Sequence, residues 1–154
     1  MAAHRTSRQQ LRRPGFPDRA PSARLGHAGR VRQHARRTER LDAALLAQEG
    51  RCFWCGQTFG RLVAPTVDHI VPRAKGGPSW AENEVAACRR CNGERGQRSP
   101  VEWLEECVRR GWPADAAALG GVLDRLDAAI DVHGGQRRAR PYLRSQRRRL
   151  ARAR

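Results

Sequence analysis

The stretch Thr66–Gly77, TVDHIVPRAKGG, lies between two Cys-x-x-Cys pairs and carries an adjacent aspartate and histidine. The first pair is Cys52 and Cys55, and the second is Cys88 and Cys91. A two-residue spacer lets both sulfurs of a pair reach one ion, and four thiolates are typical of a closed, tetrahedral structural zinc site. The sequence therefore predicts a zinc ion that joins two distant segments of the chain. The alternatives are a redox pair or two unrelated cysteine pairs.

The polar residues of this region suit metal-assisted hydrolysis. Asp68 and His69 stand at the end of an expected strand, so their side chains should point to opposite faces. A carboxylate suits Mg²⁺ or Mn²⁺, whereas a neutral imidazole can take a proton from water. Asn83 could orient the imidazole through a hydrogen bond. Asn92 directly follows a predicted zinc ligand, so its amide oxygen could reach the same divalent ion as Asp68.

Together these residues resemble the HNH endonucleases, the zinc-bearing branch of the ββα-metal (His-Me finger) nucleases. The resemblance covers about residues 52–98 and rests on the two cysteine pairs, the DHIVP core, the double glycine and the CRRCN end, in this order. It implies a β-hairpin followed by a helix that grips one divalent ion. It also implies that His69 is the general base, that Asp68 and Asn92 are the metal ligands, and that Asn83 supports the base.

Two positions depart from the family pattern. Asn92 stands where a histidine is common, and Arg95 stands where a lysine often follows in the helix. Arg95 lies about one helical turn after Asn92, so we expect it to hold a phosphate of the nucleic acid, together with Arg73 and Lys75 from the central stretch.

The composition favours a polyanionic partner. The 154 residues carry 31 Lys+Arg against 15 Asp+Glu, a formal net charge of +16, and residues 137–154 hold nine arginines and no acidic residue. Such charged ends often contact nucleic acid, although solvated tails are the alternative. No apolar run is long enough to span a membrane, and residues 1–10 lack the apolar region of a secretion signal. With paired cysteines, this predicts a reducing, cytoplasmic location, with an Arg-rich transit peptide as the alternative.

The expected fold class is α+β, with a small ββα-metal core held by a four-cysteine zinc site, flanking helices and disordered Arg-rich termini. Ser99-Pro100 followed by Glu102 is typical of a helix start, and Cys107 falls within that helix as a core thiol. The predicted organisation is a disordered basic arm over 1–30, a flanking helix over 31–50, the nuclease core over 51–98, C-terminal helices over 99–136 and an Arg-rich tail over 137–154.

These observations predict a metal-dependent endonuclease that hydrolyses DNA phosphodiester bonds and nicks one strand per active site. Its cofactors would be structural Zn²⁺ and catalytic Mg²⁺ or Mn²⁺, and it would act as a monomer or weak dimer away from membranes. RNA is the alternative substrate. A zinc-ribbon-like module that binds nucleic acid without cutting it is the alternative function. A basic structural protein of ribonucleoproteins would explain the charge but none of the central residues.

Overall fold

The computed structural model describes residues 27–153, with the backbone alone over residues 27–35. Of the predicted basic arm over 1–30, residues 1–26 lie outside this range, and the first helix begins at His27 rather than at residue 31. The elements are α1 (His27–Ala47), β1 (Pro65–His69), the 3₁₀ helices η1 (Arg73–Lys75) and η2 (Ala81–Asn83), β2 (Glu84–Cys88), α2 (Arg89–Arg95), α3 (Pro100–Arg109), α4 (Ala116–His133) and α5 (Ala139–Arg152).

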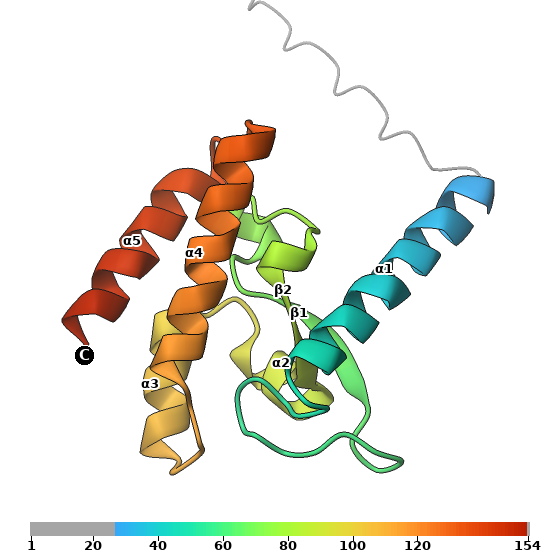
Figure 1. The fold of residues 1–154 in the computed structure, drawn as a ribbon. Helices are drawn as coiled ribbons and strands as arrows, with labels where there is room; N and C mark the ends of the chain where they lie inside the picture. The colour runs from blue at the N-terminus through green and yellow to red at the C-terminus, as the bar shows by residue number, and fades with distance from the viewer. Residues whose placement is uncertain (1–26, 154) are drawn as a thin grey trace, which may run out of the picture.

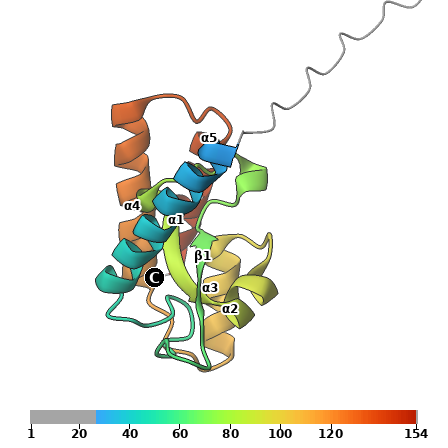
Figure 2. The same ribbon diagram turned by 90° about the vertical axis from the view of Figure 1, so that its right-hand side faces the viewer.

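A two-stranded antiparallel hairpin followed at once by α2 forms the centre of the molecule, which confirms the predicted hairpin-then-helix order. In its register, Asp68 lies opposite Val85 and His69 lies opposite Glu84. Figures 1 and 2 show α1 on one side of this hairpin and α4 and α5 on the other. The hairpin is therefore covered on both sides, and every residue of β2 is buried.

The outer edge of β2 is covered by the first cysteine turn and by the residue after α1. Phe53 N donates to Ala86 O at 3.0 Å. The Gln48 side chain donates to Ala86 O and accepts from Ala86 N, both at 2.8 Å. An uncovered edge strand would expose unpaired backbone groups. These bonds satisfy them and attach both segments to the hairpin.

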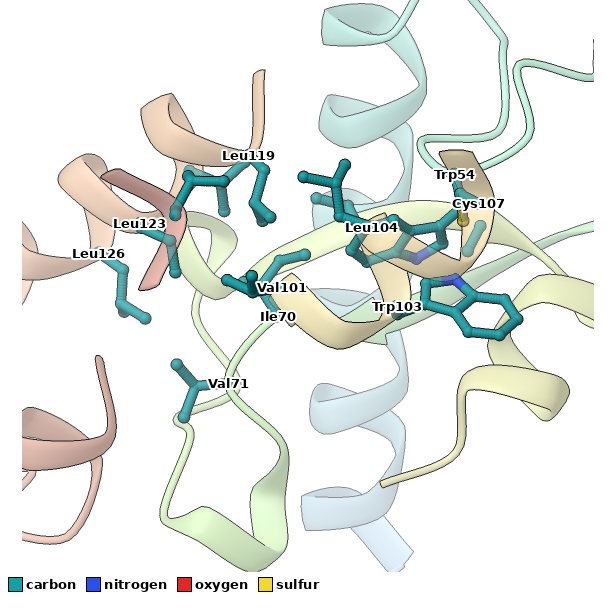
Figure 3. Close-up of a cluster of buried hydrophobic side chains, with 14 of the residues drawn as sticks. Trp54, Ile70, Val71, Val101, Trp103, Leu104, Cys107, Leu119, Leu123 and Leu126 are labelled. Atoms are coloured by element: carbon teal, nitrogen blue, oxygen red, sulfur yellow. The ribbon is translucent and has the colours of Figure 1, made fainter. Parts of the chain in front are cut away.

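The C-terminal helices supply most of the aliphatic core. The predicted start of α3 is confirmed, because Ser99 and Glu102 form a reciprocal capping box. Cys107 is fully buried, as predicted. The C-terminal helices predicted over 99–136 include α4, which runs unbroken through Gly120 and Gly121. Figure 3 shows the cluster in which side chains from α3 and α4 meet residues of the centre, among them Trp54, Ile70, Val101, Trp103, Leu119, Leu123 and Leu126.

The prediction of a disordered Arg-rich tail at the C-terminus is wrong, because residues 139–152 form helix α5. Its inner side buries Leu143, Gln146 and Leu150 at helical spacing. Arg149 also donates to Glu102 of α3 at 3.1 Å. The arginines occupy the outer positions of an amphipathic helix, so their density conceals a narrow apolar stripe. No helix in the described range is long and apolar enough to cross a membrane.

Candidate active site and metal centre

The four predicted zinc ligands come together at the base of the hairpin. The sulfurs of Cys52, Cys55, Cys88 and Cys91 all lie within 4.8 Å of one another. Backbone N–H groups donate to two of them, from Cys88 to the Cys52 sulfur at 3.3 Å and from Cys91 to the Cys88 sulfur at 3.4 Å. The pKa of Cys52 is lowered to about 4, chiefly by a hydrogen bond from the Cys91 side chain. The cluster could hold a metal ion, and its donor set fits tetrahedral zinc.

Asp68 lies on the face of the hairpin that α2 covers, and it is only 4% exposed. Its Oδ2 accepts from Trp54 Nε1 at 2.8 Å, and its Oδ1 forms an ion pair with Arg95. Burial raises the pKa of Asp68 above its ordinary value, and the charge of Arg95 and the bond from Trp54 only partly offset this. The carboxylate is therefore held in the interior by two donors.

His69 lies on the other face of the hairpin, the face turned toward α1. Its Nε2 is 3.1 Å from Ser79 Oγ and 3.2 Å from Glu84 Oε1. Glu84 is in turn bonded by Arg40 of α1, with Nε to Oε2 at 2.6 Å. Nδ1 has no hydrogen-bond partner among the described residues, and 19% of the side chain is exposed. One ring nitrogen is therefore fixed, and the other is available to take a proton.

Asn83 does not bond the imidazole, which corrects the predicted contact. Its Oδ1 accepts from Val71 N at 2.8 Å, and its Nδ2 donates to Val71 O at 3.1 Å and to Pro78 O at 2.8 Å. These three hydrogen bonds require a glycine at position 77, because a Cβ there would lie 1.8 Å from Val71 O. Asn83 precedes β2, so it faces the connecting loop, while the first strand residue faces His69. Asn83 thus braces the loop that follows the histidine.

Asn92 is half-buried on α2 and lies against β1. Its Nδ2 donates to Thr66 Oγ1 and to Val67 O, each at 3.0 Å. Its Oδ1 has no hydrogen-bond partner within residues 36–153. A carboxylate has about four lone-pair positions, and Asp68 uses two of them. An amide oxygen and a carboxylate fit Mg²⁺ or Mn²⁺ by donor chemistry, although the ion would compete with Arg95 for Asp68.

The predicted phosphate contact of Arg95 is wrong for this arrangement, because the side chain is 1% exposed. Its guanidinium forms the ion pair with Asp68 and donates to the backbone oxygens of His69 at 2.9 Å and Ile70 at 2.7 Å. It also lies 5.4 Å from the ring centre of Trp54. The last turn of α2 aims the side chain into the hairpin, so Arg95 fastens the strand end rather than facing solvent.

Arg73 and Lys75, the other two predicted phosphate contacts, are exposed on η1. A further basic surface, which the sequence placed in a disordered tail, lies on α5. There Arg144, Arg148 and Arg152 are exposed and make no ion pair with a described residue. Arg147 of the same helix is paired with Asp124 and Asp127. Unpaired positive charge is therefore present on η1 and on the outer side of α5, in addition to exposed arginines elsewhere such as Arg61 and Arg89.

Comparison with known proteins agrees with the motif. The family model described as HNH endonuclease matches residues 52–106. A curated relative, the CRISPR-associated endonuclease Cas9 of Actinomyces naeslundii, is 39% identical over 69 residues, which are 44% of this chain and 6% of that protein. The crystal structure of the Type II-C Cas9 enzyme from the same species aligns with 58% of this chain and 10% of that chain, at 31% identity and a TM-score of 0.45.

Residues 52–106 thus match the family model described as HNH endonuclease, as the cysteine pairs and the DHIVP core predicted. The chain corresponds to only 6% of the length of the curated relative that it matches. The structure places the predicted base and the predicted ligand Asp68 on opposite faces of the hairpin. It also adds two residues that the sequence reasoning missed, Glu84 and Arg40. Glu84 could have been found from the sequence, because it directly follows Asn83 and lies opposite His69 once the hairpin register is known.

Proposed function

We propose that this chain is a metal-dependent HNH endonuclease that hydrolyses phosphodiester bonds in DNA and nicks one strand per active site. The observation that carries the proposal is His69 at the end of β1, inside the segment that matches the family. Its Nε2 is engaged by Glu84 and Ser79, and its Nδ1 is without a partner among the described residues. An imidazole held in this way is suited to general-base catalysis.

In the proposed reaction, Nδ1 of His69 accepts a proton from the water that attacks the phosphorus. Asp68 and Asn92 would hold a divalent ion, Mg²⁺ or Mn²⁺. Such an ion would offset the charge that develops on the phosphate oxygens. Asn83 keeps the loop after the base in place, and the four cysteines would bind structural Zn²⁺ at the base of the hairpin. One base per chain acts on one strand, so a single visit gives a nick.

The DNA would be held by charges outside the hairpin. Arg73 and Lys75 on η1 are exposed and lie a few residues beyond His69. The unpaired arginines of α5 extend the basic surface. Phosphate contacts of this kind supply affinity without reading the sequence. RNA would satisfy the same charges, so the choice of DNA rests on the family resemblance.

A zinc-containing module that binds nucleic acid without cutting it is the second candidate. The burial of Asp68 and its ion pair with Arg95 favour it, because a carboxylate in this state has to exchange a cationic partner for the metal. It gives no role to the free Nδ1 of His69 or to its bond with Glu84.

Supercoiled plasmid incubated with the zinc-loaded protein separates the two candidates. The proposal expects relaxed circles in Mg²⁺ or Mn²⁺, no product in EDTA that leaves the zinc in place, and no product from His69→Ala at equal DNA binding. Linear plasmid at low conversion would contradict the nicking part alone. Equal nicking by His69→Ala would contradict the assignment of the base, and binding without any product would favour the second candidate.

A further inference from the structure

A relay of three side chains connects α1 with the candidate base across the hairpin. Glu84 is the first residue of β2 and lies opposite His69 in the antiparallel register. Opposite residues of such a pair present their side chains on one face, at the distance of direct contact. Glu84 Oε1 is 3.2 Å from the imidazole Nε2. Arg40 donates to the same carboxylate with Nε at 2.6 Å and Nη2 at 3.2 Å.

The carboxylate in this relay is closed off from water, because the Glu84 side chain is only 2% exposed. Burial alone would raise the pKa of Glu84, but the hydrogen bonds from His69 and Arg40 more than offset it, and the pKa lies below its ordinary value. Glu84 is therefore an anion that accepts hydrogen bonds and cannot donate one. The hydroxyl of Ser79, 3.1 Å from the same Nε2, can donate or accept, so it is compatible with either tautomer. The carboxylate at 3.2 Å favours a proton on Nε2, and the neutral imidazole then keeps Nδ1 as its acceptor.

We propose that Glu84, held in place by Arg40, is the positioning residue that fixes the orientation and tautomer of His69, with Nδ1 as the proton acceptor. The proposal rests on the proposed nuclease function for its kinetic consequences, but not for the ring geometry. Arg40 lies in α1, outside the segment 52–106 that matches the family, so α1 would contribute a residue to the active site. A partner that orients a reactive histidine is worth about 10- to 100-fold in activity in comparable sites.

The substitution Glu84→Gln gives an unusual signature. Arg40 requires an oxygen, and its shorter bond is to Oε2. The glutamine would therefore keep its carbonyl oxygen toward Arg40 Nε and turn its NH₂ group toward His69. An NH₂ group donates, so Nε2 would become an acceptor and the proton would move to Nδ1. This reversal gives up the longer bond from Arg40 Nη2 to Oε1 but keeps the size and shape of the side chain, and it removes the acceptor atom of the base.

The matched control is Gln48→Ala. Gln48 also joins the region of α1 to β2, through two hydrogen bonds to Ala86, but it does not touch His69. A purely structural role for Glu84 predicts that both variants lose activity in proportion to their loss of stability. A positioning role predicts that only Glu84→Gln changes the histidine.

The experiment records ¹⁵N NMR of the neutral His69 ring in the full zinc-loaded chain, assigned with His69→Ala, beside single-turnover nicking. We expect an Nε2–H ring in the parent and in Gln48→Ala and an Nδ1–H ring in Glu84→Gln. We also expect the single-turnover rate constant at saturating protein to fall about 10- to 100-fold in Glu84→Gln at unchanged DNA affinity. A parent ring protonated at Nδ1, or an unchanged ring in Glu84→Gln, would overturn the proposal. A correct ring in a protein that nicks nothing would instead refute the proposed function and leave the positioning intact.

Discussion

The two faces of the β1–β2 hairpin each hold a carboxylate against an arginine, and they differ in what else that carboxylate touches. On the α2 face, Asp68 is bonded to Arg95 and Trp54, both inside the core. On the α1 face, Glu84 is bonded to Arg40 and to His69, whose ring reaches solvent. The first arrangement fastens the hairpin to α2. In the second, the buried charge of Glu84 acts on the imidazole of His69, which is partly exposed.

The contrast teaches that alternation along one strand can separate a structural function from a chemical one. Asp68 and His69 are neighbours in the chain, yet their side chains enter different environments because successive strand residues point to opposite faces. The proposed metal ligands lie with α2, and the proposed base lies with α1. Substitutions on the α2 face should therefore act on stability and on metal binding together, and those on the α1 face first on the proton transfer.

Loss of a zinc ligand should disrupt both faces together, because they belong to the same hairpin. Cys88→Ser should release the metal and unfold the centre, since apparent zinc binding energies of about 10–16 kcal/mol are also folding energy in small sites. Cys107→Ser is the matched control, because this buried cysteine lies outside the cluster. Metal content by mass spectrometry and far-UV circular dichroism report the outcome. A folded, metal-free Cys88→Ser protein would show that the hairpin needs no zinc.

The arginines of the two faces should differ in their contribution to stability. Arg95→Ala leaves Asp68 buried and unpaired, which costs about 3–5 kcal/mol. Arg40→Ala leaves Glu84 with its bond to His69 and a partly solvated opening, so we expect about 1–2 kcal/mol. Urea unfolding of the zinc-loaded proteins measures both free energies. Equal losses would mean that the two faces are energetically alike and would remove the basis of the comparison.

Arginines on α5 offer a test away from both faces. Arg148→Gln should reduce the log–log salt slope of DNA binding by about 0.9 if the side chain contacts a phosphate. Arg147→Gln makes the same change of charge on the same helix, but that residue is already paired with Asp124 and Asp127, so its slope should change less. Fluorescence anisotropy at several salt concentrations distinguishes them. Neither variant should alter the single-turnover rate at saturation.

The two carboxylates should respond to pH with opposite signs. The pKa of Glu84 is lowered on folding. Its ionisation therefore adds to the free energy of unfolding above its ordinary pKa of 4.5, and this stabilisation is lost as the pH falls through the folded pKa. The pKa of Asp68 is raised, so its contribution is greatest below the ordinary value of 3.8 and is lost as the pH rises through the folded pKa. As the pH falls, we expect the free energy of unfolding of the parent to decrease relative to that of Glu84→Gln. Relative to Asp68→Asn, it should increase. Any effect of acid on the cysteine cluster is common to all three proteins, and slopes of the same sign would contradict the assignment.

Local sequence patterns were sufficient for the parts of the fold that depend on spacing. The two cysteine pairs and the capping box at Ser99 follow from residues a few positions apart, whereas the hairpin was implied by the family resemblance. Helix α4, within the helices predicted over 99–136, buries its apolar residues at a periodicity that is equally local. In α5 the same periodicity was present at Leu143, Gln146 and Leu150 but was concealed by the arginines around it.

The parts of the site that escaped the sequence depend on distant partners. Arg40 and Glu84 are 44 positions apart, so nothing in either segment indicates the pair. The Arg95 side chain points inward because of the way α2 crosses the hairpin. Its spacing from Asn92, taken alone, had suggested a phosphate contact. Asn83 shows the limit most clearly. The residue was predicted to support the imidazole, but its bonds go to the loop backbone.

The most direct test of the central claim is the single-turnover cleavage rate of an end-labelled DNA duplex, with the binding constant measured in parallel. His69→Ala, loaded with zinc and saturated with DNA, should bind as the parent does and cleave about 10² to 10⁴ times more slowly, because it lacks only the general base. A His69→Ala protein that binds equally and cleaves at the parental rate would contradict the claim that this histidine, presented from the α1 face of the hairpin, carries the chemistry.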